Sequence, residues 1–449
     1  GYNPIKVSQA YYCEDPFLNQ LGVNPVFNLL TSTLDDNRKE NRTLHLMSEE
    51  DALSKVQKYL HRQGIDRLSP IARKVEREGT PNRRNVVLVF MESMSANLMG
   101  TFGSDKKLTP YLDSLYQQSL SFSHFYSSGI HTNHGIYSTL YSFPAIMKRN
   151  AMKGSVIPVY SGLPTVLQEN GYCNLFFMTH ESQYDNMNAF LRTNGFDEIY
   201  AQENYPSEKV VNSFGVQDDF MYQYALPILN ERAGTGNPFF SVLLSISNHP
   251  PYVIPPYFHP HSDVLEEQIV EYADWSIRQF MQAAEKQPWF DNTIFVFLGD
   301  HGKMVGTPEC EMPQSYNHIP LMIYGKDIKP GVYDGFGGQV DVSPTLLGLL
   351  NISYLQNNFG VNLLEEERPC MFFTADNLIG ARDSVNMFIY SPDSQQEFRY
   401  KLEEGKLRAA TGTDEEAFRN LKDYCFSMLQ STESLVKEHK TLDKVSVKK

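Results

Sequence analysis

The chain has 449 residues, 41% of them hydrophobic and 20% charged, which predicts a large folded domain with a smaller one beside it and argues against a disordered chain. Its 39 basic and 53 acidic residues leave a net charge of −14, which argues against nucleic acid as a partner, because neutralising phosphates requires a basic surface. No stretch approaches the roughly 18 consecutive apolar residues of a membrane-spanning helix.

Residues 1–80 are predicted to form a helical lead-in. Ser48 is a favourable N-cap, and the acidic residues at 49–51 suit the first turn of the helix that follows. The polar stretch 80–85 then has the composition of a linker. Because the chain starts at Gly1 without an initiator methionine, we expect it to be part of a longer protein, whose missing part would hold membrane helices.

Strand and helix patterns alternate along the middle of the chain. Continuous apolar runs predict buried strands at 85–93, 173–180, 237–249, 293–302 and 318–325. Amphipathic segments between or after them predict helices at 109–119, 162–172, 265–286 and 340–352. Such an alternation indicates an α/β fold with a mostly parallel central sheet flanked by helices.

The pattern changes beyond about residue 370. Residues 386–412 alternate polar and apolar side chains with turn signals, which is typical of antiparallel strands, and Glu404-Gly405 is the expected hairpin tip. Residues 414–440 have the pattern of a helix. We therefore expect a smaller C-terminal α+β subdomain.

Polar side chains follow three of the predicted strands at the point where each strand ends. Glu92 follows the first strand, Asn248 and His249 follow another, and Asp300 and His301 follow a third. The carboxyl ends of parallel strands lie along one edge of a sheet, where functional residues of open α/β folds gather. A carboxylate after a single strand is often only a helix N-cap, but three strands that all end in this way favour a shared site.

Asp300 and His301 are the strongest candidates for metal ligands among these residues. A carboxylate beside an imidazole suits a divalent cation, and Glu92 could supply a second carboxylate from another strand. We expect one metal ion, Mn²⁺ or Zn²⁺ in the first place, with Mg²⁺ or Ca²⁺ as alternatives.

A nucleophile is expected from residues 125–145, which are rich in Ser, Thr and His and lead into a short helix predicted around 135–142. Thr132 stands just before that helix, whose N-terminal N–H groups would favour a phosphoryl oxygen. A divalent cation can lower the pKa of a hydroxyl group and so activate it. The alternative for Thr132 is an ordinary loop or capping residue.

Five segments together resemble a known family. They are VVLVFMES (86–93), SGIHTNHGIYSTL (128–140), NHPPY (248–252), GDHG (299–302) and HIPLMIYG (318–325). In this order they resemble the lipoteichoic-acid-synthase-like sulfatase group of the alkaline-phosphatase superfamily, which includes phosphoglycerol transferases that act on cell-envelope glycans.

The resemblance implies a domain organisation and a location. It predicts a helical lead-in from a membrane region at 1–80, a sulfatase-like catalytic domain at 81–370, and C-terminal antiparallel strands plus a helix at 371–449. Residues 17–30 resemble the segment that joins the family's membrane helices to its extracytoplasmic domain. The chain is therefore expected to be the extracytoplasmic part of a bacterial membrane protein, on the periplasmic or cell-surface side.

The resemblance also implies residue roles. Glu92, Asp300 and His301 resemble the family's metal ligands, and Thr132 resembles the residue that both binds metal and takes the phosphoryl group. His249 resembles a substrate-side histidine that contacts phosphoryl oxygens or the leaving group, and it or a neighbour is expected to assist proton transfer. The predicted substrate-binding residues are His134, Asp185, Asn186, Asn188, His249 and His318.

Two departures concern substrate recognition. His134 stands where relatives often carry an arginine, and residues 186–188 read Asn-Met-Asn in the head-group segment, where some glycerol-phosphate transferases have a Trp and an Arg. For His134 and His318, a hydrogen-bonded structural histidine is the alternative.

The resemblance implies a transferase that moves a phosphoglycerol-like head group from a phospholipid or another phosphodiester donor to a glycan, through a phospho-Thr intermediate. The alternatives are a phosphodiesterase, phosphatase or sulfatase-like hydrolase with water as acceptor, and a binding domain without catalysis. The Cys/Ser-x-Pro-x-Arg signature of sulfatases is missing at the nucleophile position, which argues against sulfate-ester hydrolysis.

Overall fold

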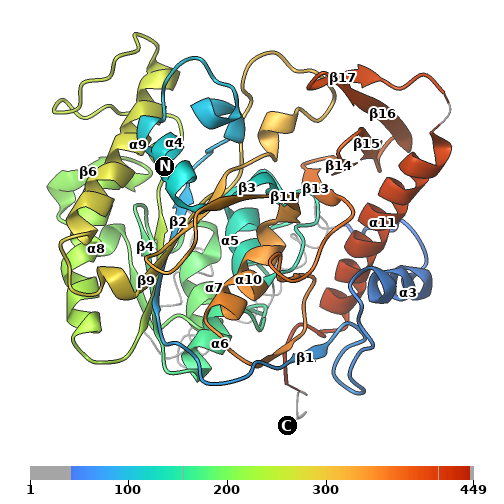
Figure 1. Cartoon of the computed structure of the whole chain (residues 1–449), viewed down its shortest axis with the longest axis horizontal. Coiled ribbons are helices and arrows are strands. Elements are labelled where there is room, and N and C mark those ends of the chain that lie inside the picture. Colours follow the sequence, from blue (N-terminus) through green and yellow to red (C-terminus); the bar gives the residue numbers. More distant parts are fainter. Residues whose placement is uncertain (1–41, 155, 413, 445–449) are drawn as a thin grey trace, which may run out of the picture.

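The computed structural model describes residues 42–154, 156–412 and 414–444, so the segment 17–30 lies outside the described residues (Figure 1). Its centre is an eight-stranded sheet in the order β11-β3-β10-β9-β2-β8-β4-β5. The strands are β2 (Asn85–Met91), β3 (Leu120–Tyr126), β4 (Cys173–Met178), β5 (Glu198–Tyr200), β8 (Phe239–Leu244), β9 (Thr293–Gly299), β10 (Leu321–Tyr324) and β11 (Gly331–Gly338).

The sheet is mostly parallel, as predicted. Strands β9, β2, β8, β4 and β5 run parallel to one another, and β11 runs parallel to β3. Only β10 is antiparallel to both of its neighbours, β9 and β3. The predicted strand at 318–325 therefore exists, but it runs against the direction of the strands that end in the polar residues.

Helices cover both faces of the sheet. One face carries α4 (Pro110–Gln118), α8 (Asp218–Ala233) and α9 (Leu265–Ala284). The other carries α5 (Thr132–Tyr141), α6 (Leu163–Glu169), α7 (Met187–Thr193) and α10 (Val342–Leu349). Successive residues of β2 join the two cores alternately, as the two-residue period of a strand requires, so the sheet is buried on both sides. A small hairpin of β6 (Val210–Asn212) and β7 (Gly215–Val216) lies outside the main sheet.

The described part of the lead-in is only partly helical. Helix α3 (Glu49–Tyr59) starts at the predicted N-cap, because the Ser48 side chain accepts a hydrogen bond from the backbone N–H of Asp51. Strand β1 (Arg73–Val75) then pairs with β12 (Tyr354–Gln356). None of the helices within the described ranges is long and apolar enough to cross a membrane.

The C-terminal unit is a five-stranded antiparallel sheet with one long helix, as predicted. The strands are β13 (Met371–Ala375), β14 (Leu378–Arg382), β15 (Asn386–Ser391), β16 (Gln396–Glu403) and β17 (Lys406–Ala409). Residues 404 and 405 form the tip between β16 and β17, both with positive φ. Helix α11 (Glu415–Lys437) packs on this sheet and beside α3, as Figure 1 shows.

Candidate active site

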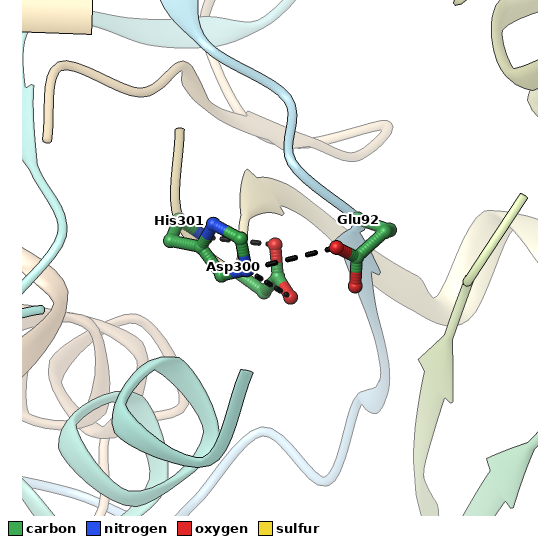
Figure 2. Close-up of side chains that lie close together, drawn as sticks. All are labelled: Glu92, Asp300 and His301. Carbon is green, nitrogen blue, oxygen red and sulfur yellow. Dashed lines mark hydrogen bonds and ion pairs between the residues drawn. The ribbon is translucent and has the colours of Figure 1, made fainter. Parts of the chain in front are cut away.

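The candidate site lies where two neighbouring strands end. Glu92 directly follows β2, and Asp300 and His301 directly follow β9, its parallel neighbour. The ligand atoms of these three side chains all lie within 4.8 Å of one another, and Figure 2 shows the side chains turned toward one space. The first residue of α5, Thr132, reaches the same place from the adjoining helix.

The distances make this a compact cluster. The Thr132 Oγ1 lies 2.9 Å from Oδ2 of Asp300 and 3.3 Å from Oε2 of Glu92. The His301 Nε2 lies 3.5 Å from Oδ2 of Asp300 and 3.6 Å from Oε1 of Glu92. The structure thus brings together the four residues that the sequence assigns to the metal.

The two carboxylates are almost completely buried, Glu92 with 1% and Asp300 with 0% of its surface exposed. Burial raises the pKa of Glu92 well above its ordinary value, and the nearby charge of Asp300 raises it further. Two buried carboxylates side by side are costly unless a cation or a proton lies between them. This donor set of carboxylates, a hydroxyl and an imidazole therefore fits a divalent metal ion.

Hydrogen bonds fix how these groups face the centre. The backbone N–H groups of Ser93 and His301 donate to Oδ1 of Asp300 at 2.8 and 2.7 Å, which leaves Oδ2 for the centre. The Nδ1 of His301 lies 2.7 Å from the carbonyl oxygen of Gly302. A carbonyl oxygen can only accept, so Nδ1 carries the proton and the lone pair of Nε2 faces the carboxylates, as metal ligation requires.

Helix α5 comes unusually close to the end of β9. A Cβ atom on Gly135 would lie 2.2 Å from the carbonyl oxygen of Asp300, so only glycine allows this approach. That carbonyl also accepts a hydrogen bond of 2.8 Å from Nε2 of Gln339. The helix begins at Thr132, three residues earlier than predicted, and this places the hydroxyl at the helix N-terminus, where N–H groups favour an anion.

The predicted residues His249 and Asp185 lie on neighbouring loops. His249 is half-buried, its Nδ1 lies 2.7 Å from the carbonyl oxygen of Pro250, and no hydrogen bond among the described residues joins it to the metal cluster. Asp185 accepts a hydrogen bond of 3.2 Å from Asn133, the residue after Thr132. Of these two, only Asp185 makes a hydrogen bond to helix α5 among the described residues.

Asn186 and Asn188 hold their own segment together. The Nδ2 of Asn186 donates to the carbonyl oxygen of Met152 at 2.8 Å. The Nδ2 of Asn188 donates to the Ser182 hydroxyl at 3.1 Å. Their part in head-group binding stays a prediction.

His134 is buried and His318 is half-buried, and both rings bond to the backbone. The Nε2 of His134 donates to the carbonyl oxygen of Arg149 at 3.0 Å, and that of His318 donates to Ser123 at 2.8 Å. Burial lowers the pKa of His134 to about 3 and that of His318 to about 4. The structure places His318 between aromatic rings and does not bring it to the metal cluster, so its role as a substrate contact stays a prediction without geometric support.

Two further residues adjoin the site without having been predicted. Lys303 stands directly after the GDHG motif, a position that could have drawn attention to it. Asp376 lies in the turn between β13 and β14 of the C-terminal unit, and its Oδ1 is 2.6 Å from Nε2 of His131, the N-cap of α5. No local pattern marks Asp376, because its contact joins segments 245 residues apart.

The sheet topology and the convergent Glu, Thr, Asp and His define the class, which is the alkaline-phosphatase superfamily. The sulfatase family model matches residues 84–352, and the chain belongs to that family. A structure of an alkaline-phosphatase-superfamily protein from Vibrio parahaemolyticus is 25% identical, with a TM-score of 0.79 over 88% of this chain and 97% of that one.

Two lipoteichoic-acid-synthase relatives are also similar. The structure of the lipoteichoic acid synthase LtaP from Listeria monocytogenes has a TM-score of 0.69 at 22% identity, over 86% of this chain and 98% of that one. The lipoteichoic acid synthase-like protein YvgJ of Bacillus subtilis is 25% identical over 73% of this chain and 56% of its own length. The chain thus spans about half the length of the curated relatives that it matches.

Proposed function

We propose that the chain is the catalytic part of a metal-dependent phosphotransferase that works through a covalent phospho-Thr132 intermediate. The observation that carries this proposal is the position of the Thr132 hydroxyl, 2.9 Å from Asp300 at the N-terminus of α5 and among Glu92 and His301. Among the described contacts, this hydroxyl group makes no hydrogen bond to the backbone of its own helix, as a capping side chain would. Its position instead suits a nucleophile.

Glu92, Asp300 and His301 would hold the metal together with the Thr132 oxygen. A bound divalent cation would lower the pKa of the hydroxyl group and neutralise negative charge on the phosphoryl group. The Thr132 proton already faces the carboxylate of Asp300. The helix N-terminus adds N–H groups that favour phosphoryl oxygens.

The reaction would proceed in two displacements at phosphorus. In the first, the Thr132 hydroxyl gives up its proton and its oxygen bonds to phosphorus while the bond to the donor's leaving oxygen breaks, and that oxygen takes up a proton. In the second, an acceptor hydroxyl loses its proton and bonds to phosphorus while the bond from phosphorus to the Thr132 oxygen breaks, and the Thr132 oxygen takes up a proton. His249, or a neighbouring group, is the predicted proton carrier in the second displacement.

We infer the substrates from the relatives' names. The donor would be a phospholipid or another phosphodiester with a phosphoglycerol-like head group, and the acceptor a cell-envelope glycan. The enzyme would work on the extracytoplasmic side of a bacterial membrane, anchored through a segment outside this chain.

The decisive experiment replaces the nucleophile. Thr132→Ala in the Mn²⁺-loaded protein should lower kcat on a nitrophenyl phosphodiester by at least about 10³-fold, because it removes the hydroxyl that takes the phosphoryl group. Intact-mass analysis of wild-type protein quenched during turnover should show a phosphorus-containing adduct that maps to Thr132. Thr139→Ala, in the same helix but buried without a hydrogen-bond partner, is the matched control and should keep both activity and adduct. Wild-type turnover in Thr132→Ala would exclude the proposal, and release of the phosphomonoester in the absence of glycan would assign water as the acceptor.

A further inference from the structure

Lys303 is an unusual cation beside the candidate site. It follows Asp300 and His301 in the loop after β9 and is half-buried. Its ammonium group lies 5.6 Å from the centre of the Tyr252 ring. Its one hydrogen bond among the described residues, of 2.7 Å, goes to Oδ1 of Asn248, which is a neutral amide.

The charge of Lys303 has no protein partner at contact distance. No carboxylate of the described ranges lies within ion-pair distance of its Nζ, although Glu92 and the exposed Glu266 act on it from farther away. An ammonium group has three N–H donors, so two of them are free of described protein contacts. Charged side chains that leave water are usually paired, and an unpaired one facing a site suggests an anion that arrives with a ligand.

Asn248 ties this cation to the metal cluster. Its Nδ2 donates to the carbonyl oxygens of Glu92 and Ser93 at 3.2 and 3.3 Å. Both carbonyls can only accept, so the amide orientation is fixed and Oδ1 must face the Lys303 ammonium. The same buried amide therefore sets the backbone that carries Glu92 and the direction of the Lys303 side chain.

We propose that Lys303 binds a non-bridging oxygen of the phosphoryl group held at the Glu92–Asp300–His301 site. The proposal rests on the proposed function and adds a residue to it. The metal ion would balance the two carboxylates, while the Thr132 alkoxide and a phosphodiester would bring two further negative charges. Lys303 supplies a further positive charge, and it favours phosphate or sulfate esters over neutral carbonyl substrates.

Binding of an inorganic anion tests this role without turnover. Thr132→Ala protein loaded with Mn²⁺ is titrated calorimetrically with inorganic phosphate and, separately, with inorganic sulfate. Adding Lys303→Gln, which keeps the hydrogen bond to Asn248 but removes the charge, should weaken phosphate binding about tenfold or more. Lys303→Arg should keep most of the affinity, and the same Lys→Gln change at the exposed Lys326 should have no effect. The ratio of the phosphate and sulfate affinities identifies which anion the site prefers.

Mn²⁺ affinity and melting temperature are measured on every variant. The inference predicts that both stay unchanged in Lys303→Gln, whereas a lysine that only links two loops would lower them. The inference would be overturned if Lys303→Gln bound phosphate as tightly as the parent, or if it also lost Mn²⁺ affinity. It would also be overturned if the parent bound neither anion. If the wild type forms the Thr132 adduct but Lys303→Gln leaves the phosphate affinity unchanged, only the role of Lys303 is excluded. If no adduct forms but phosphate binding depends on Lys303, only the covalent mechanism is excluded.

Discussion

At the scale of single residues, His318 shows how surroundings decide what a histidine does. Its ring stacks on Tyr126 and meets Phe102 edge-on, and its Nε2 donates to the carbonyl oxygen of Ser123. Burial lowers its pKa to about 4, and the positive charges of Arg382 and His124 act in the same direction. The sequence offered both a substrate contact and a structural histidine, and the structure provides the surroundings of the second.

The lowered pKa of His318 predicts that the folded protein becomes less stable as the pH falls. The unfolded chain binds a proton at His318 near the ordinary pKa of 6.5, whereas the folded chain does so only near 4. The contribution of His318 to stability is therefore complete above pH 6.5 and declines as the pH falls toward 4. Melting temperatures should fall more steeply over this interval in the wild type than in His318→Gln. The exposed His259→Gln should follow the wild type, and parallel curves for all three proteins would contradict the prediction.

At the scale of elements, the position of α5 against β9 sets the spacing between the Thr132 hydroxyl and the two carboxylates. The contact depends on Gly135, whose missing side chain leaves room for the carbonyl oxygen of Asp300. Gly135→Ala should push the helix away, lower kcat/KM on a nitrophenyl phosphodiester at least about tenfold and weaken Mn²⁺ binding, since small displacements in such sites are costly. Gly331→Ala, at a glycine with open space around it, should change neither quantity. An active, metal-binding Gly135→Ala protein would show that the helix position is not limiting.

The same scale shows what could be predicted from the sequence. Strands β2, β8 and β9 are buried on both faces, so their continuous apolar runs stand out, and the residues that follow them point to the metal cluster. Strands β3 and β11 were not predicted, because polar residues interrupt one and glycines the other. Asp376 could not be predicted either, because its contact with His131 depends on how the C-terminal unit docks.

At the scale of the whole molecule, a fully buried ion pair holds the segment leading into the C-terminal unit. Arg368 makes two hydrogen bonds to Asp341, of 2.9 and 2.6 Å, and a third of 2.8 Å to the Tyr424 hydroxyl on α11. The pair thus joins the start of α10 to the C-terminal helix. We expect such a buried pair to specify how the two units are arranged more than to add net stability.

Breaking this pair should be strongly destabilising. Arg368→Met leaves Asp341 buried without its cation, which should cost about 3–5 kcal/mol of unfolding free energy. Urea denaturation with a tryptophan-fluorescence readout would measure this loss. Arg408→Met, in the same unit but mostly exposed, should change the unfolding free energy by less than about 1 kcal/mol. Equal midpoints for the two variants would show that the pair is dispensable.

The contact of Asp376 with His131 bears on how such chains can recombine. The segment that matches the sulfatase family ends at residue 352, so it contains every residue of the metal cluster but not the carboxylate that holds the neighbour of Thr132. A hybrid that joined this segment to a distant relative's C-terminal sheet would keep the metal cluster. It would lose the contact between Asp376 and His131, so we expect the Thr132 hydroxyl to be displaced. We therefore expect the family-matching segment and the C-terminal unit to be inherited together, although the C-terminal unit supplies no residue of the metal cluster.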